Sequence, residues 1–232
     1  MDSPGLLALV GGDEWTDGCS FDATLLAASG GTDVLVLPTA AAYQHPERVV
    51  FGAAEWFSQL GAQVEGLMVV DRASAEDPGM AATVGAAKFI YLADGSPLHL
   101  KAVLKRSAVF EALREAWLGG AVVAGAAAGA MVLTDPMVDP RGGALTLGLG
   151  LVTQLAVVSH YSDEHDDVHG QKFTRTVAMA PAALPVVGIP ARTALLREPS
   201  GAWRAEGAGV PAVFVGGKPA EGLGALPQTV LA

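Results

Sequence analysis

The stretch from Ala121 to Leu133 has the residue types of a strand, a tight turn and a helix in immediate succession. Residues 121–124 are apolar and include two valines, which is typical of a strand buried on both faces of a parallel sheet. Gly125 and Gly129 bracket the turn. This order is the frame of a nucleophile elbow, in which a strained turn presents a serine or cysteine for attack on a carbonyl carbon. The middle position is Ala127, which has no nucleophilic atom.

The hexapeptide from Gly125 to Ala130 resembles the Gly-x-Ser-Ala-Gly-Ala motif of the dipeptidase E and cyanophycinase family of serine peptidases. That family belongs to the class I glutamine amidotransferase-like superfamily. The match holds at every position except the nucleophile, which is Ala127 here. Taken alone, the hexapeptide reads equally as an alanine-rich and glycine-rich core turn without chemistry, because short motifs often match by chance. The rest of the chain favours the family.

Two other segments fall where the family has catalytic groups. Asp94-Gly95 stands in place of a glycine-rich turn after the fourth strand, and the resemblance assigns the N–H groups of Gly95 and Ala128 to an oxyanion hole. His160 comes directly after the strand that follows the elbow, where the family has its general base. A histidine at a strand end is more often structural when nothing else surrounds it. Beside the elbow, we expect His160 to lie in the site.

The third member of the family's triad is an acidic residue, often in a segment resembling Gly-Ile-Asp-Glu-x-Thr-Ala-Leu. The matching segment here is 188–195, and its acidic pair has become Pro190-Ala191. Ala191 therefore marks a lost acid position, although the acid's placement varies more than the elbow's. Loss of both nucleophile and acid favours natural divergence, because once a nucleophile is gone further losses cost little activity. We expect an inactive relative whose pocket binds a small acidic peptide or metabolite.

Two alternatives stay open. In the first, an active serine-type dipeptidase or isopeptidase carries an introduced alanine at position 127, and Asp163 or Asp166 orients His160. In the second, the protein has a metal-dependent function built on His160, His165 and His169. Residues 165 and 169 lie four apart and would share one face of a helix. A solvated acidic loop explains the same residues, and no family motif supports a metal, so we expect neither metal nor other cofactor.

Three residues outside the triad are candidates for binding. Asp94 belongs to the suspected oxyanion turn, and His99 opens the helix that follows it. Arg192 is a cation suited to an acidic ligand, although a surface ion pair would explain it as well. Cys19, the only cysteine, has no histidine near it in sequence and reads as a buried or incidental thiol.

Strands and helices alternate through the first 135 residues, which predicts a parallel, doubly wound, flavodoxin-like sheet with helices on both faces in a single domain over residues 1–232. The expected strands are apolar runs that end in turn residues, at 6–10, 34–37, 64–70, 89–92 and 121–124. The expected helices have apolar stripes or caps and cover 21–29, 45–60, 76–87, 98–105 and 108–118.

The C-terminal third has a different pattern. One strand-like run at 151–158 leads to His160, and a helix is expected over 173–180. Shorter strands with Gly and Pro turns follow, at 186–189, 193–197, 203–204 and 210–215. We expect them to extend the sheet with antiparallel edges.

The composition limits the partners. The chain of 232 residues carries a net charge of −10 with its few basic residues scattered, so we expect no nucleic acid and no anionic membrane as partner. No apolar run reaches the ~20 residues of a membrane span, and no secretory signal is visible. A single cysteine fits a reducing compartment, and we expect a cytoplasmic protein. The sequence leaves open a homodimer and does not identify the ligand.

Overall fold

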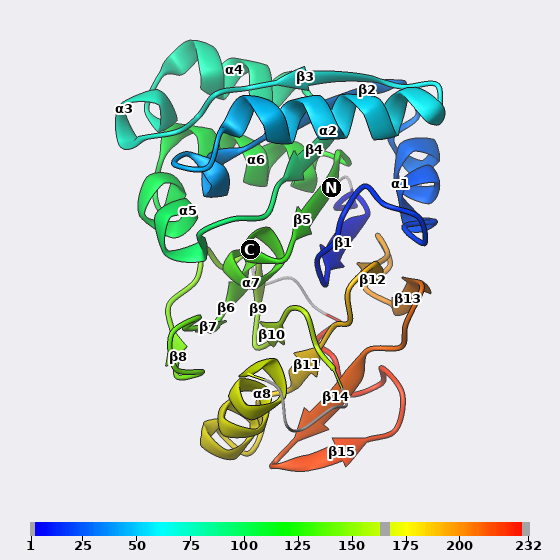
Figure 1. Ribbon diagram of the computed structural model, residues 1–232, viewed down its shortest axis with the longest axis vertical. Coiled ribbons are helices and arrows are strands. Elements are labelled where there is room, and N and C mark those ends of the chain that lie inside the picture. The colour runs from blue at the N-terminus through cyan, green and yellow to red at the C-terminus, as the bar shows by residue number, and fades with distance from the viewer. Residues whose placement is uncertain (1–2, 163–167, 229–232) are drawn as a thin grey trace.

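The computed structural model describes residues 3–162 and 168–228 and is built around a seven-stranded sheet (Figure 1). Its strand order is β13-β12-β1-β5-β4-β2-β3. The strands are β1 (Leu7–Val10), β2 (Asp33–Leu37), β3 (Gln63–Gly66), β4 (Phe89–Leu92), β5 (Val122–Ala126), β12 (Thr193–Arg197) and β13 (Trp203–Gly207). The first five pair in parallel, and β12 and β13 add two antiparallel strands beside β1.

Helices cover both faces of this sheet, because the central strands are apolar on both faces. On one face, α1 (Phe21–Ser29) and α2 (Pro46–Gln59) pack against side chains such as Ala8, Val10 and Tyr91. The other face, with Leu7 and Leu9, is covered by five helices: α3 (Arg72–Ala75), α4 (Pro78–Ala86), α5 (Pro97–Leu104), α6 (Ala108–Leu118) and α7 (Ala128–Leu133). The expected doubly wound α/β fold is confirmed. Among the described residues, every helix is too short or too polar to span a bilayer.

Helix starts follow the expected local chemistry. Ser107 caps α6 by accepting a hydrogen bond from the N–H of Phe110, and Ser96 caps α5 through the N–H of His99. Pro46 occupies the first turn of α2, where its missing N–H costs nothing. The short 3-10 helix η1 (Thr39–Ala41) lies between β2 and α2.

Two predictions in the first half were wrong in detail. The strand expected at 64–70 ends at Gly66, and residues 67–70 leave the sheet. The helix expected at 76–87 is α4 and starts two residues later than predicted, because Asp77 caps it and Pro78 occupies its first turn. A separate short helix that was not predicted, α3, precedes it and is capped by Asp71. Pro78 has no N–H to continue a helix from α3, and it fits the first turn of the next one.

The C-terminal third builds a second sheet, contrary to the prediction that all its strands extend the first. Four strands pair in the order β10-β11-β14-β15: β10 (Ala156–Val158), β11 (Val186–Gly188), β14 (Ala212–Val215) and β15 (Lys218–Ala220). The run 151–158 is broken into β9 (Val152–Thr153) and β10, with β9 pairing to β6 (Thr134–Asp135). A small hairpin joins β7 (Met137–Val138) to β8 (Leu145–Thr146), and the longer helix α8 (Val168–Met179) lies beside the second sheet (Figure 1).

One apolar cluster connects the two sheets. It runs from Leu92 and Val123 of the first sheet, through Met131 of α7, to Val157 and Val187 of the second. Residue 160, at the end of β10, is thereby carried to the carboxyl edge of the parallel strands. That edge is where open α/β sheets place their ligand sites.

Candidate active site

Ala127 lies at the turn between β5 and α7 in a strained backbone conformation. Its φ is 39° and its ψ is −94°, a region that L-residues rarely adopt. Its N–H donates to the carbonyl oxygen of Val10 over 2.9 Å, and its side chain is buried. The flanking glycines are required by close approach, since a Cβ on Gly129 would lie 2.7 Å from the carbonyl oxygen of Leu92. The strand, turn and helix predicted from the sequence are all present.

Two backbone N–H groups beside this turn point at one oxygen atom. The N–H of Gly95 and the N–H of Ala128 donate to Oδ1 of Asp94, over 2.6 Å and 3.0 Å. Gly95 has a φ of 147°, and its Cα packs so close to the Ala40 carbonyl that no side chain would fit. The structure thus brings together the two groups that the resemblance assigns to an oxyanion hole, and an aspartate side chain receives both.

His160 faces the same aspartate from the other side. Its Nε2 lies 3.8 Å from Oδ2 of Asp94, an ion-pair separation. The Asp94 carboxylate raises the pKa of His160 against the opposing effect of partial burial. Burial acts to raise the pKa of Asp94, but His160 and the N–H groups of Ala128 and Gly95 outweigh it and hold that pKa below its usual range. The backbone of His160 is fixed by its N–H, which donates to the Gly11 carbonyl over 2.7 Å.

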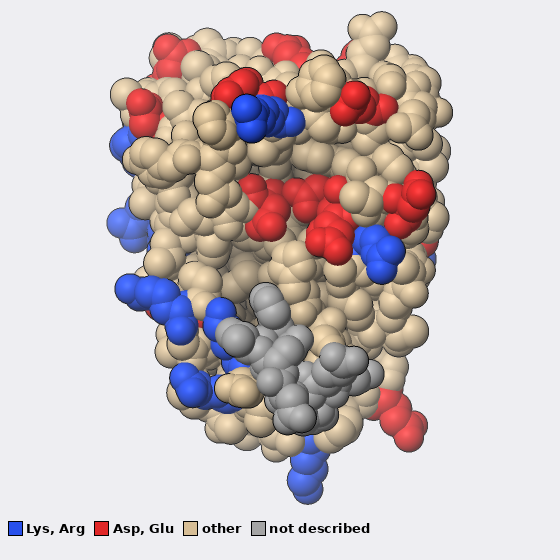
Figure 2. All heavy atoms as spheres, viewed as in Figure 1, with Lys and Arg blue, Asp and Glu red and all other residues tan. Residues whose placement is uncertain are grey.

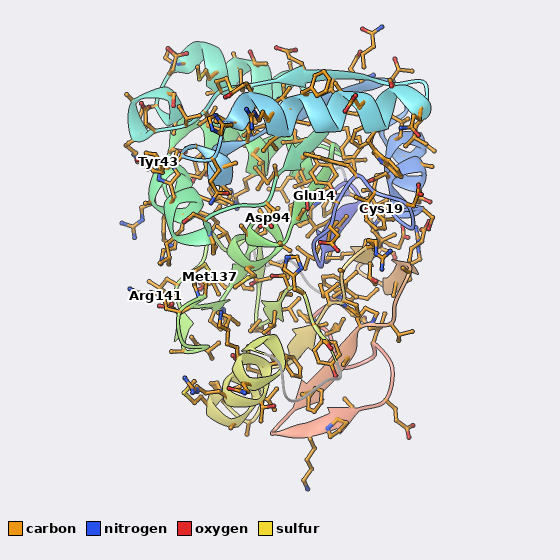
Figure 3. The ribbon with its side chains drawn as sticks, in the orientation of Figure 1. Glu14, Cys19, Tyr43, Asp94, Met137 and Arg141 are labelled. Carbon is orange, nitrogen blue, oxygen red and sulfur yellow. The ribbon has the colours of Figure 1, made fainter. Side chains whose placement is uncertain are left out.

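Glu14 is a member of the site that was not predicted. Its Oε1 accepts the N–H of Asp94 over 3.0 Å, and burial raises its pKa. The sequence signal was its position, because Glu14 follows β1 at the carboxyl edge of the sheet. Asp and Glu side chains gather in the middle of this face in Figure 2, where Figure 3 labels Glu14 and Asp94. The candidate site therefore combines a histidine with at least two carboxyl groups.

A cavity of about 240 Å³ opens beside these residues. Ala127, Asp94 and His160 form part of its wall, and Met131, Val138 and Val158 are among its apolar lining. Lys172 of α8, which was not singled out from the sequence, also lines it, as does Asp139, whose carboxylate is paired with Arg141 at 2.6 Å. The cavity suits a small organic ligand with polar ends.

Several predicted residues lie away from this cavity. Nε2 of His99 is 2.9 Å from the Val70 carbonyl oxygen and its ring meets Tyr43 edge-on, so packing explains it. Arg192 is exposed and does not line the cavity. Ala191, the lost acid position, lies in the segment that packs against Gly11 and Gly12 near His160. Cys19 is buried, as predicted.

The described residues give no support to the metal alternative. Among residues 3–162 and 168–228, no group of three or more His, Cys, Asp or Glu side chains is arranged to hold a metal ion. His165, Asp163 and Asp166 lie outside the described residues, and the side chain of His169 is not described.

Fold and site together define a doubly wound α/β protein of the class I glutamine amidotransferase-like type. The model of peptidase family S51 matches residues 7–203, and the chain belongs to that family. It is 27% identical over 215 residues to a cyanophycinase from Synechococcus elongatus and 26% identical over 171 residues to one from Trichormus variabilis. These alignments cover 88% and 69% of this chain, but only 66% and 57% of the cyanophycinases, so the chain spans less than two thirds of their length.

Solved structures agree with this assignment. A peptidase from an acI-B1 Actinobacterium superposes with a TM-score of 0.78 at 25% identity, covering 92% of this chain and 91% of the other. A putative peptidase E protein from Listeria monocytogenes superposes with a TM-score of 0.68 at 17% identity, covering 89% of this chain and all of the other. The second likeness concerns the fold alone.

Proposed function

We propose that this chain is a non-hydrolysing member of peptidase family S51 that binds a small peptide or metabolite in the cavity beside Ala127. The observation that carries the proposal is Ala127 itself, a methyl group at the strained turn where the family has its serine. Without a nucleophilic oxygen, His160 has no hydroxyl to deprotonate, and loss of such a nucleophile costs on the order of a million-fold in turnover.

The ligand we propose is a small peptide or metabolite with an acidic group. Lys172 is the lysine in the wall of the cavity and would pair with a ligand carboxylate. The apolar surface between Met131 and Val158 would cover the ligand's carbon skeleton. We propose a cytoplasmic location, on the strength of the single buried thiol.

Binding without turnover tests the proposal. The protein would be mixed with Asp-X dipeptides and β-linked aspartyl dipeptides, with binding followed by calorimetry and hydrolysis by release of free amine. We expect saturable binding by at least one dipeptide and no amine release above the buffer rate. Hydrolysis by the unmodified protein would reject the proposal.

A pair of lysine variants locates the bound ligand. Lys172→Met is expected to weaken binding of an acidic dipeptide at least about tenfold, or 1.4 kcal/mol, because the ligand carboxylate loses its counter-charge. Lys101→Met removes the same charge from α5, outside the cavity wall, and should leave binding unchanged. Equal effects of the two variants would place the ligand elsewhere.

A second candidate is an active serine peptidase in which Ala127 replaced the serine recently or deliberately. It is favoured by the strained φ and ψ of Ala127, which have no use in a plain core turn. Ala127→Ser would then react rapidly with a fluorophosphonate probe and hydrolyse aspartyl dipeptides. A folded Ala127→Ser variant that stays unlabelled would exclude this candidate.

A further inference from the structure

We infer that Asp94 is an internal ligand of the oxyanion hole: its carboxylate already takes both backbone N–H groups that a substrate's carbonyl oxygen would need. This inference rests on the proposed function, because it concerns the same cavity. It adds a barrier to hydrolysis that is independent of Ala127, and it determines which ligand groups the site accepts.

The contact geometry carries the inference. Oδ1 of Asp94 receives the Gly95 N–H over 2.6 Å and the Ala128 N–H over 3.0 Å, both within normal hydrogen-bond length. A carboxylate is a charged acceptor, and hydrogen bonds to it are roughly twice as strong as those to a neutral oxygen. A neutral peptide carbonyl therefore competes poorly for the same two donors.

The surrounding residues hold the carboxylate in this position. The backbone N–H of Asp94 is fixed by Glu14, at 3.0 Å, and Oδ2 lies 3.8 Å from Nε2 of His160. The next residue, Gly95, is pressed against the Ala40 carbonyl. Both carboxylate oxygens of Asp94 and its backbone N–H therefore have partners, so the fold itself holds the carboxylate in the oxyanion hole.

The consequence concerns substrate class. An acyl or carboxylate oxygen is excluded from the hole while Asp94 occupies it, so a ligand carboxylate must bind elsewhere in the cavity, toward Lys172. Restoring serine at position 127 would not by itself restore acyl transfer, because the tetrahedral oxyanion would find its donors occupied.

The unmodified protein provides the first test. The amide proton shifts of Gly95 and Ala128 would be followed by NMR while the pH is lowered. We expect both amides to move together, at the pH where the Asp94 carboxyl gains its proton, because both donate to that oxygen. If the two amide shifts did not change as the Asp94 carboxyl is protonated, the inference would be overturned.

Vacating the hole provides the second test. In Asp94→Gly, the amides of Gly95 and Ala128 lose their acceptor, and sodium acetate should shift both of them saturably. Acetate should bind this variant at least about tenfold more tightly than it binds the unmodified protein. Glu55→Gln is the control for the loss of one negative charge, since Glu55 is exposed on α2 and lies outside the cavity wall, and it should behave like the unmodified protein. Equal acetate response of all three proteins would overturn the inference.

A double variant tests whether Asp94 slows the reaction of a serine at position 127. We expect Ala127→Ser alone to react slowly with the fluorophosphonate, and Ala127→Ser with Asp94→Gly to react at least about tenfold faster. Labelling of the single variant as fast as the double variant would show an open hole and overturn the inference. Dipeptide hydrolysis by the unmodified protein would instead reject the proposed function, and the amide titration would still report whether Asp94 fills the hole.

Discussion

Oδ2 of Asp94 lies 3.8 Å from Nε2 of His160, although the two residues are 66 positions apart in the sequence. The aspartate comes from the turn after β4 and the histidine from the end of β10, so the contact joins the two sheets. It places the imidazole and the carboxylate beside each other in the wall of the cavity. Each stabilises the charged form of the other, which raises the pKa of His160 and lowers the pKa of Asp94.

The first prediction concerns His160. Asp94→Asn removes the charge that raises the pKa of His160, so we expect that pKa to fall in the variant, as measured by NMR of the imidazole Cε1 proton. Asp139→Asn should leave the His160 titration in place, because Asp139 does not contribute to its shift. An unchanged titration in Asp94→Asn would contradict the pairing.

The same pair gives stability a pH window. The lowered pKa of Asp94 means that its contribution is present above the ordinary value of 3.8 and is lost as the pH falls through the lowered pKa. The raised pKa of His160 means that its contribution is complete below 6.5 and is lost as the pH rises through the raised pKa. The pair therefore contributes most between these two ordinary values, and urea unfolding of Asp94→Asn should differ most from the unmodified protein there.

The second prediction concerns Gly12, whose φ is 116°. A Cβ at this position would overlap the imidazole of His160. Gly12→Ala should displace that ring and lower the free energy of unfolding by more than about 2 kcal/mol. Gly52→Ala in α2 is the control, since a Cβ there meets open space and should raise stability by about 0.5–1 kcal/mol. Equal denaturant midpoints for Gly12→Ala and the unmodified protein would show that the ring does not need this space.

The third prediction tests the strain at Ala127. Glycine adopts a φ of 39° and ψ of −94° more readily than alanine, so Ala127→Gly should raise the free energy of unfolding by about 1 kcal/mol. Ala124→Gly, in the middle of β5, should instead lower the free energy of unfolding by about 1 kcal/mol. Glycine there adds conformational entropy to the unfolded chain and relieves no strain in the strand. Chemical denaturation of both variants measures the contrast, and losses of similar size would mean that the turn is unstrained.

The fourth prediction concerns Asp22, which is fully buried on α1 and accepts a hydrogen bond from Nε1 of Trp56 over 2.9 Å. Burial raises its pKa to about 8, with Glu14 adding to the shift. Between about pH 4 and pH 8 the folded protein therefore keeps a proton that the unfolded chain has lost, and stability falls as the pH rises.

Asp22→Asn has no such proton to lose. Its gain in unfolding free energy over the unmodified protein should be larger at pH 8 than at pH 5, by on the order of 3 kcal/mol. Urea unfolding at the two pH values measures this difference. Parallel pH profiles for the two proteins would show that Asp22 ionises normally.

The sequence by itself determined the local elements and the family. Helices α1 and α6 and strands β4 and β12 lie at their predicted bounds. The signals that set these bounds are local: an apolar pattern, a serine cap or a glycine stop lies within a few residues of each element. The glycines around Ala127 indicated the strained turn for the same reason. His160 was found because its position relative to that turn is a feature of the family.

Only the tertiary structure decided what surrounds these residues. Asp94 was expected to bind a ligand, but its contacts with Ala128 and Glu14 span 34 and 80 positions and depend on where parallel strands end in space. The short strands of the C-terminal third carry no pattern that says which sheet they join, because register and partner are set by packing on Met131, Val157 and their neighbours. The direction of one carboxylate, fixed by two N–H groups and one imidazole, is a property of the assembled fold.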